Sequence, residues 1–379
     1  MEPFTLAVPQ AQLDDLRQRL QRTRWPDQIA GYGWRQGTER GYLQELVAYW
    51  QQGYDWRRQE AQWNEFPQFT TTVAGQRLHL VHARSPHAGA RPLLILHGWP
   101  GAVYEFYKHI PRLTQPERFG GQAGEAFHVV APALPGYGFS AAPSAPGATP
   151  RRLAAWLHAL MVEALGYRRF ALQGGDWGSV IASWLALDHP GSVLALHLNM
   201  AAMRPALGPG APPLTAEERA FLERAKAQRS EDLAYQAIQG TRPQTLGYGL
   251  HDSPAGLAAW LVEKFRAWSD CGGEVERAIS RDEMLTLITW YWVTGSITSS
   301  MRLYYEHKHA SDALQPGQRV AVPTGFADFP GEVLRAPRSW IERCYALEHW
   351  QDMPRGGHFA ALEQPQLLAE ELWKFFRGR

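Results

Sequence analysis

The sequence predicts an α/β fold with a mostly parallel central sheet, a helical insertion before the last strands and an N-terminal extension. Short apolar runs alternate with helical stretches along most of the chain, and strands linked by helical crossovers form parallel sheets covered on both faces. Residues 201–318 interrupt this alternation with helices rich in aromatic side chains. The chain has 379 residues, of which 45% are hydrophobic and 20% charged, so it has ample material for a core.

The first 90 residues predict two helices followed by a pair of strands. Apolar residues recur at helical spacing from Leu13 to Leu20 and again from Tyr42 to Trp50. Residues 69–73 and 78–82 read as two strands around a tight turn at 74–77. We expect this N-terminal region, 1–90, to pack against the core without chemistry of its own. The charge runs at 57–60 and 217–219 are expected to lie on solvated helix faces.

The remaining apolar runs predict the strands of the core. They occupy residues 93–96, 127–131, 170–173 and 193–198, and after the insertion 320–324 and 345–347. The chain thus divides into a first core segment at 91–200, a helical cap at 201–318 and a second core segment at 319–379. Ligands of open α/β sheets bind at the carboxyl ends of the strands. We therefore expect the cap to cover a ligand site there.

Charge and cysteine content exclude several classes of protein. With 38 Lys and Arg against 37 Asp and Glu, the net charge is +1, which provides no general attraction to nucleic acid or to acidic membranes. Cys271 and Cys344 are isolated in the sequence, so neither a disulfide framework nor a zinc site is expected. No metal and no cofactor are predicted, and the expected partner is a small apolar molecule. The sequence leaves the oligomeric state open, a homodimer included.

The start of the sequence predicts a soluble, cytoplasmic protein. Residues 1–9 lack the basic and apolar regions of a signal peptide. No window reaches the length of about 18 consecutive apolar residues that a membrane span needs.

The clearest local motif is LQGGDWGS at residues 172–179. It follows an apolar strand, precedes a helical run and has the form of a nucleophile elbow, in which glycines permit a strained turn that exposes the central side chain. That central residue is Asp176, where a lipase has serine. The alternative is a glycine-rich turn whose aspartate caps the next helix.

A second motif, HGWPG at residues 97–101, follows the strand at 93–96. In elbow-containing folds this loop donates an N–H group to the oxyanion hole. We expect the backbone N–H groups of Trp99 and Trp177 to face one developing oxyanion, and the His97 side chain to have a structural role.

A third motif, RGGHFA at residues 355–360, places His358 after the last strand. The order nucleophile, acid, histidine requires a carboxylate between Asp176 and His358. The loop after residues 320–325 supplies two, Asp328 and Glu332. From the residues alone either could orient His358.

Together these three motifs resemble the microsomal-type epoxide hydrolases of the α/β-hydrolase superfamily. The resemblance runs almost from end to end, because residues 55–57 and 69–85 are similar to that family's N-terminal domain and residues 251–260 to its cap. It implies an α/β-hydrolase fold with a mostly parallel central sheet, a helical cap insertion and an N-terminal helical and meander extension. The membrane-anchoring N-terminal helix of the animal members has no counterpart in this sequence, which favours a soluble, bacterial-type member.

The resemblance also implies roles for individual residues. Asp176 would be the nucleophile and His358 the base. Tyr235 and Tyr304 fall where the family's ring-activating tyrosines lie, with Tyr305 as a competing choice. Residues 322–332 are similar to the family segment whose acid lies two residues after a Phe-Pro pair, which favours Glu332, whereas other α/β-hydrolases would favour Asp328.

An aspartate nucleophile suits a substrate with a leaving group on a saturated carbon. Attack by a carboxylate gives an ester, which water can hydrolyse, whereas attack by serine would give an inert ether. Opening an epoxide also requires a proton donor, and a tyrosine hydroxyl with a pKa of about 10 can serve. We therefore expect conversion of apolar epoxides to vicinal diols. The rival hypotheses are a haloalkane dehalogenase with the Trp177 N–H as halide ligand, and a catalytically silent ligand-binding protein.

Overall fold

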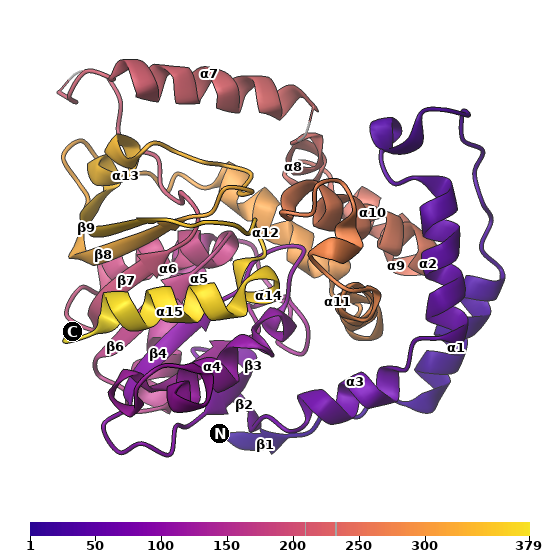
Figure 1. The fold of residues 1–379 in the computed structure, drawn as a ribbon, viewed down its shortest axis with the longest axis horizontal. Coiled ribbons are helices and arrows are strands. Elements are labelled where there is room, and N and C mark those ends of the chain that lie inside the picture. Colours follow the sequence, from indigo (N-terminus) through magenta and orange to yellow (C-terminus); the bar gives the residue numbers. More distant parts are fainter. Residues whose placement is uncertain (209, 232) are drawn as a thin grey trace.

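The computed structural model describes residues 1–208, 210–231 and 233–379, and its strands form one nine-stranded sheet (Figure 1). The order across the sheet is β1-β2-β3-β5-β4-β6-β7-β8-β9. The first three strands are antiparallel to their neighbours, and β5, β4, β6, β7, β8 and β9 are parallel to one another. The strands are β1 (Glu2–Phe4), β2 (Gln68–Val73), β3 (Gln76–Ala83), β4 (Arg91–Leu96), β5 (Phe127–Pro132), β6 (Phe170–Gly174), β7 (Val193–Leu198), β8 (Val320–Asp328) and β9 (Tyr345–Asp352).

All strands expected from the apolar runs are present, and one further strand was not expected. β1 is three residues long and mostly exposed, so it carries no apolar signal. It forms because its backbone pairs with β2 at the sheet edge, with Pro3 opposite Phe69.

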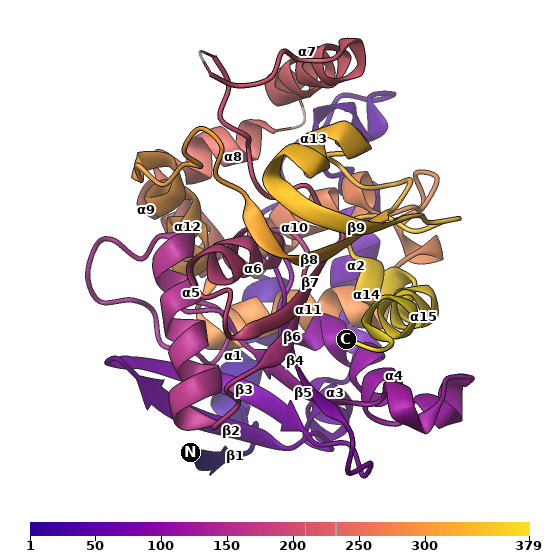
Figure 2. The ribbon, with the colours of Figure 1, turned by 90° about the vertical axis from the view of Figure 1, so that its left-hand side faces the viewer.

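Helices cover both faces of the sheet, as parallel strands require. Figure 2 shows the sheet with α5 (Pro150–Ala159) and α6 (Trp177–Asp188) on one side and α4 (His109–Thr114) and α15 (Pro365–Phe376) on the other. Residues 177–186 of α6 are all buried, which is consistent with its position between the sheet and α5.

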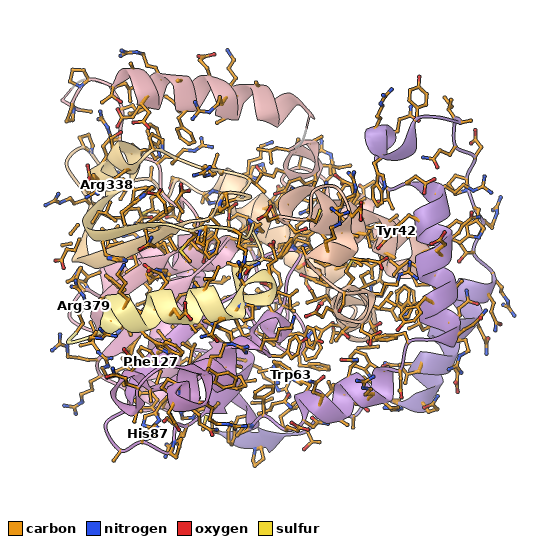
Figure 3. The ribbon with its side chains drawn as sticks, viewed as in Figure 1. Tyr42, Trp63, His87, Phe127, Arg338 and Arg379 are labelled. Carbon is orange, nitrogen blue, oxygen red and sulfur yellow. The ribbon has the colours of Figure 1, made fainter. Side chains whose placement is uncertain are left out.

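The N-terminal region has three α-helices where the sequence predicted two. They are α1 (Gln10–Gln21), α2 (Arg40–Gln52) and α3 (Trp56–Trp63). α3 was missed because its sequence is largely polar, but Asp55 caps its first turn by accepting a hydrogen bond from the Arg58 N–H (3.2 Å). Trp63, labelled in Figure 3, fixes its other end by packing its ring edge to face on Trp290 at 5.4 Å.

The expectation that both charge runs are solvated is wrong for one glutamate in each. Glu60 is buried and accepts a hydrogen bond from the Val8 N–H (2.7 Å). This bond connects α3 to the segment between β1 and α1. Glu218 is buried too, and the Arg343 guanidinium donates to it (Nε–Oε1, 2.7 Å). Both carboxylates have hydrogen-bonding partners, as buried charges require.

In the sequence the cap is inserted between β7 and β8, and in space it extends over the loops at the strand ends (Figure 1). Its last helices contact both the N-terminal helices and the core. Two short helices, α13 and α14, lie in the second core segment. Among the described residues, no helix combines the length and apolar character needed to cross a bilayer. The bounds are α7 (Ala216–Glu231), α8 (Ala234–Gln239), α9 (Pro243–Asp252), α10 (Pro254–Trp268), α11 (Arg281–Thr294), α12 (Ile297–His309), α13 (Arg338–Cys344) and α14 (Ala360–Glu363).

Candidate active site

Asp176 stands on a sharp turn between β6 and α6. Its backbone has φ 48° and ψ −127°, a conformation that costs free energy for any residue with a side chain and that is concentrated at functional sites. Gly178 makes the turn possible, because a Cβ atom there would lie 2.0 Å from the Leu96 carbonyl oxygen. The structure thus has the strand–turn–helix geometry that the elbow motif predicted.

The HGWPG loop meets this aspartate from β4. The Trp99 N–H donates a hydrogen bond to Asp176 Oδ1 (2.7 Å). Gly98 allows the approach, since a Cβ atom on it would lie 2.2 Å from the same oxygen. Trp177 is the first residue of α6, where backbone N–H groups have no acceptor within the helix. Of the two backbone groups expected at the oxyanion hole, the Trp99 N–H contacts the carboxylate and the Trp177 N–H follows it directly in the chain.

The side chain of His97 has the structural role that we expected. Its Nε2 accepts a hydrogen bond from the Leu134 N–H (3.1 Å), and its Nδ1 lies 3.0 Å from the Gly98 carbonyl oxygen. Burial lowers the pKa of His97 to about 4, so the ring is neutral and can accept this bond. It fixes the loop that carries Trp99.

His358 joins the aspartate to a second carboxylate. Its Nε2 lies 3.4 Å from Asp176 Oδ2, and its Nδ1 lies 2.8 Å from Glu332 Oε1. The loops that carry His358 and Glu332 are held together by a hydrogen bond from the Gly331 N–H to the Gly356 carbonyl oxygen (2.9 Å). The three side chains form a continuous chain of interactions across the ends of the sheet.

Asp328, the competing acid, faces another partner. It is buried, and the Arg335 guanidinium pairs with both of its oxygens, Nε lying 3.0 Å from Oδ1. The structure brings Glu332 to His358 and engages Asp328 in an ion pair.

The two carboxylates determine the protonation of His358. Burial by itself would lower the pKa of the imidazole, but the charges of Glu332 and Asp176 and their hydrogen bonds outweigh burial and raise the pKa well above 6.5. These interactions therefore favour the imidazolium form of His358.

Two cap tyrosines are buried next to the oxyanion loop. Tyr235 stacks on the Trp99 ring (centroids 5.4 Å apart, planes at 11°), and Tyr304 meets that ring edge to face at 5.8 Å. The Tyr235 hydroxyl accepts a hydrogen bond from Gln236 Nε2 (3.0 Å), and the Tyr304 side chain is buried beside it, with the two phenol rings edge to face at 5.8 Å. Tyr305, the competing choice, is 40% exposed.

Both hydroxyls remain protonated at neutral pH. Burial raises the pKa of Tyr235, and the negative charge of Asp176 raises it further. Burial likewise raises the pKa of Tyr304 well above 10. The two phenols can therefore donate protons to a ligand above Asp176.

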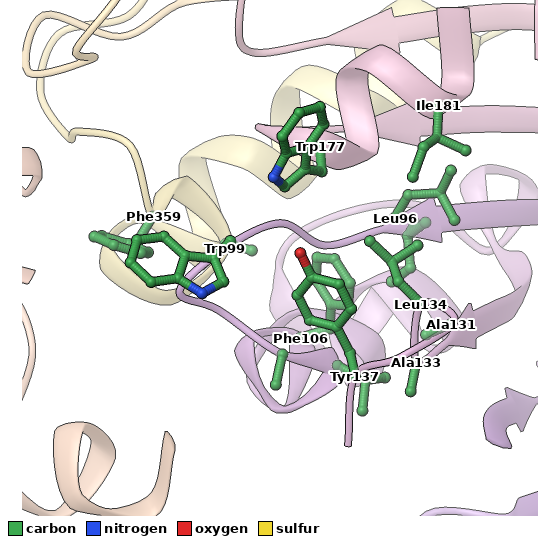
Figure 4. Packing of buried hydrophobic residues seen from close by; sticks show 14 of the residues in the cluster. Leu96, Trp99, Phe106, Ala131, Ala133, Leu134, Tyr137, Trp177, Ile181 and Phe359 are labelled. Atoms are coloured by element: carbon green, nitrogen blue, oxygen red, sulfur yellow. The ribbon is translucent and has the colours of Figure 1, made fainter. Parts of the chain in front are cut away.

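Aromatic rings line the space around the carboxylate. Figure 4 shows the side chains of Trp99, Trp177 and Tyr137 gathered around the loops at the strand ends. Trp177 packs edge to face on Tyr304 with centroids 4.8 Å apart. Such walls favour an apolar ligand.

A small cavity beside Asp176 and His358 is also lined by Glu105, which the sequence analysis missed. Its volume of about 20 Å³ can hold about one water molecule. Glu105 lies in a short 3-10 helix (Val103–Phe106) after the oxyanion loop. Burial raises the pKa of Glu105 to about 8, with the positive charge of His358 acting in the opposite direction. The sequence held one signal for Glu105, namely that it is the single acidic residue among the apolar side chains of Val103 to Phe106.

Known proteins resemble this chain over its whole length. Residues 1–106 match the family model "Epoxide hydrolase N terminus", and residues 91–242 match "alpha/beta hydrolase fold". "Epoxide hydrolase 1" of Sus scrofa is 38% identical over 401 residues, which cover 99% of this chain and 88% of that protein.

Solved structures agree with these sequence matches. The epoxide hydrolase of Aspergillus niger superposes with a TM-score of 0.86 at 33% identity, covering 99% of this chain and 96% of that one. The juvenile hormone epoxide hydrolase of the silkworm Bombyx mori gives a TM-score of 0.88 at 31% identity, covering 99% and 94%. The expected α/β-hydrolase fold is confirmed, and the chain belongs to the epoxide hydrolase family of the α/β-hydrolase superfamily.

Proposed function

We propose that this epoxide hydrolase converts apolar epoxides to vicinal diols through an ester formed on Asp176. The observation that carries the proposal is the position of Asp176, which lies 3.4 Å from His358 of the histidine–carboxylate pair and accepts a hydrogen bond from Trp99, on whose ring both cap tyrosines pack. A binding protein would have no need of a carboxylate on a strained turn beside a histidine–carboxylate pair.

In the first step Asp176 would open the ring. One carboxylate oxygen bonds to a ring carbon while the carbon–oxygen bond of the ring breaks, and the electron pair of that bond moves to the ring oxygen. Tyr235 and Tyr304 donate to this oxygen, which as a free alkoxide would be a poor leaving group. The Trp99 N–H keeps the aspartate oriented for attack.

In the second step water would cleave the ester. Esterification removes the negative charge of Asp176, which is one of the charges that raise the pKa of His358. The imidazolium can then lose its proton and act as a base toward a water molecule in the cavity. Water attacks the carboxyl carbon of Asp176 and passes a proton to His358, while the N–H groups of Trp99 and Trp177 stabilise the oxyanion and Glu332 stabilises the imidazolium. The oxyanion then collapses, the bond between the carboxyl carbon and the ester oxygen breaks, and the diol oxygen leaves with the proton of the imidazolium.

The substrate class follows from the walls of the site. Indole and phenol rings from Trp99, Tyr235, Tyr304 and Trp177 pack on one another next to the loop that contacts Asp176. These faces offer little hydrogen bonding besides the two hydroxyls, so an epoxide with an aryl or alkyl substituent fits better than a polar one.

Trapping the ester tests the mechanism. We expect His358→Gln to react with styrene oxide and to gain the mass of the substrate on a peptide that contains Asp176. In ¹⁸O-water, the wild-type enzyme should instead release diol and acquire ¹⁸O in the Asp176 carboxyl group. His349→Gln is the matched control, because His349 lies on β9 with Glu371 as its partner (2.6 Å), and this variant should turn over like the wild type.

The opposite results are equally specific. A His358→Gln protein that carries no adduct while the wild type forms diol would contradict the ester mechanism. Release of bromide from bromoalkanes, with no reaction of epoxides, would favour the dehalogenase hypothesis.

A further inference from the structure

A buried lysine lies against the proposed proton donor Tyr235. Lys264, on α10, is 4% exposed, and lysine is seldom this buried unless its charge is compensated. Its Nζ lies 4.9 Å from the ring centroid of Tyr235, 5.5 Å from that of Trp260 and 5.9 Å from that of Trp268. Its ammonium group forms an ion pair with the neighbouring Glu263, whose side chain is 32% exposed.

The three rings around the Lys264 ammonium group, those of Tyr235, Trp260 and Trp268, lie at the contact between α8 and α10. Trp260, Lys264 and Trp268 recur every four residues, so they share one face of α10. Trp260 Nε1 donates to Oε1 of Gln239 (3.1 Å), which lies one turn after Tyr235 on α8. The ammonium group is therefore held at the ring of Tyr235 by both helices.

Burial and two nearby carboxylates oppose the ionisation of Tyr235 and outweigh its hydrogen bonds with Gln236 and Tyr304, which lower its pKa. Burial removes its hydroxyl from water, and the negative charges of Asp176 and Glu332 lie close enough to raise its pKa further. A proton donor in such surroundings is weak unless a positive charge stabilises the phenolate. Lys264 brings that charge to the face of the ring.

We infer that Lys264 is an electrostatic positioning residue that stabilises the negative charge on Tyr235 during epoxide ring opening. The inference rests on the proposed function, in which Tyr235 is a proton donor. As Asp176 bonds to the ring carbon, the ring oxygen receives the released electron pair and takes the hydroxyl proton. The phenol ring becomes more electron-rich, and a cation over its face is attracted more strongly. The interaction is thus stronger in the transition state than in the ground state, which is what accelerates a reaction.

Neutral substitutions of Lys264 test this inference. We expect Lys264→Met and Lys264→Gln to slow ester formation about tenfold in single-turnover stopped-flow experiments with styrene oxide. Hydrolysis of the ester should change less than about twofold, because that step uses His358. Lys264→Gln keeps a hydrogen-bond donor for Glu263, so it serves if the Met variant does not fold. Lys264→Arg should restore most of the rate, because it restores the charge.

A matched control and a second background separate charge from structure. Arg266, also on α10, lies over the Trp34 ring at 4.6 Å, so Arg266→Met removes a cation–π pair of the same helix on the N-terminal side. It should leave ester formation unchanged. In a Tyr235→Phe background, Lys264→Gln should have no further effect, because the ring beneath Lys264 no longer carries a hydroxyl.

Three results would overturn the inference. The first is a rate of ester formation in both neutral variants within about twofold of wild type. The second is an equal loss of that rate in Lys264→Arg and Lys264→Gln. The third is that Lys264→Gln lowers the rate as much in the Tyr235→Phe background as in the wild type. Tyr235→Phe by itself tests the proposed function. If it forms ester at the wild-type rate, the role of Tyr235 fails, whereas a slow Tyr235→Phe beside an unaffected Lys264→Gln removes only the inference about Lys264.

Discussion

Replacing Glu332 by glutamine should slow hydrolysis of the ester and leave its formation largely intact. Glu332 Oε1 lies 2.8 Å from His358 Nδ1 and accepts the Val333 N–H at 2.7 Å, and its side chain is 3% exposed. A glutamine keeps the size and a hydrogen-bonding oxygen but loses the charge that stabilises the imidazolium. Ring opening by Asp176 needs no proton transfer to His358, so the first step should change little.

The size of the effect has a lower and an upper bound. A hydrogen bond to a charged group contributes about 1.5 kcal/mol more than a neutral one. The Coulomb attraction between unit charges about 4 Å apart is about 4 kcal/mol at an effective dielectric constant near 20. At about 1.36 kcal/mol for each factor of ten, we expect hydrolysis to be slower by about tenfold to 1,000-fold.

Single-turnover kinetics measures this effect, and Asp328→Asn is the matched control. Stopped-flow fluorescence or rapid quenching with intact-mass detection gives the two rate constants separately. Asp328 pairs with Arg335, so its amide variant should lose some stability but hydrolyse the ester at the wild-type rate. Hydrolysis by Glu332→Gln within about twofold of wild type, or an equal loss in Asp328→Asn, would refute the assignment of Glu332.

Three further predictions concern other parts of the site. Tyr304→Phe should slow ester formation about tenfold or more in the same assay, whereas Tyr305→Phe, which changes a 40% exposed residue, should not, and the reverse order would contradict the choice between them. Gly98→Ala should abolish ester formation with little change in circular dichroism, because its Cβ would lie 2.2 Å from Asp176 Oδ1; normal turnover would show that the loop can shift. Glu105 has its pKa raised to about 8 in the folded state against 4.5 ordinarily, so its stabilising protonated form is lost as pH rises through that window, and wild type should lose several kcal/mol of unfolding free energy relative to Glu105→Gln between about pH 5 and 8. The measurement is urea unfolding of both proteins from pH 5 to 8. A difference in unfolding free energy between them that does not change with pH would contradict the raised pKa of Glu105.

The core strands and the elbow were predictable because their signals are local. The apolar runs at 93–96, 127–131 and 170–173 are short, bounded and separated by helical stretches, and each is a strand in the structure. Gly174 is needed by the backbone of the turn itself, because a Cβ atom on it would lie 2.4 Å from the Gly178 carbonyl oxygen, so the glycine pattern identifies the turn in part locally. Gly178 is needed for the close approach of Leu96 on β4.

Other features had no local signal. β1 and α3 are polar and short, and they are held by pairing with β2 and by packing against Trp290. Glu60 and Glu218 appear in the sequence as members of solvated charge runs, yet each is buried because a partner from another part of the chain meets it, namely the Val8 N–H and Arg343.

The sequence by itself determined the fold class, the elbow turn at Asp176 and the order of the three motifs along the chain, because motif and strand order are properties of neighbouring residues. Only the tertiary structure distinguished the competing side chains in position. Glu332 and Asp328 are four residues apart, and the direction of one loop brings the first to His358 and the second to Arg335. Tyr304 and Tyr305 are adjacent, and the rotation of α12 buries the first and exposes the second. Glu105 and Lys264 also became candidates only in the structure. The fold places Glu105 at the cavity beside Asp176 and Lys264 over the ring of Tyr235, and the effect of a charge depends on the groups that surround it.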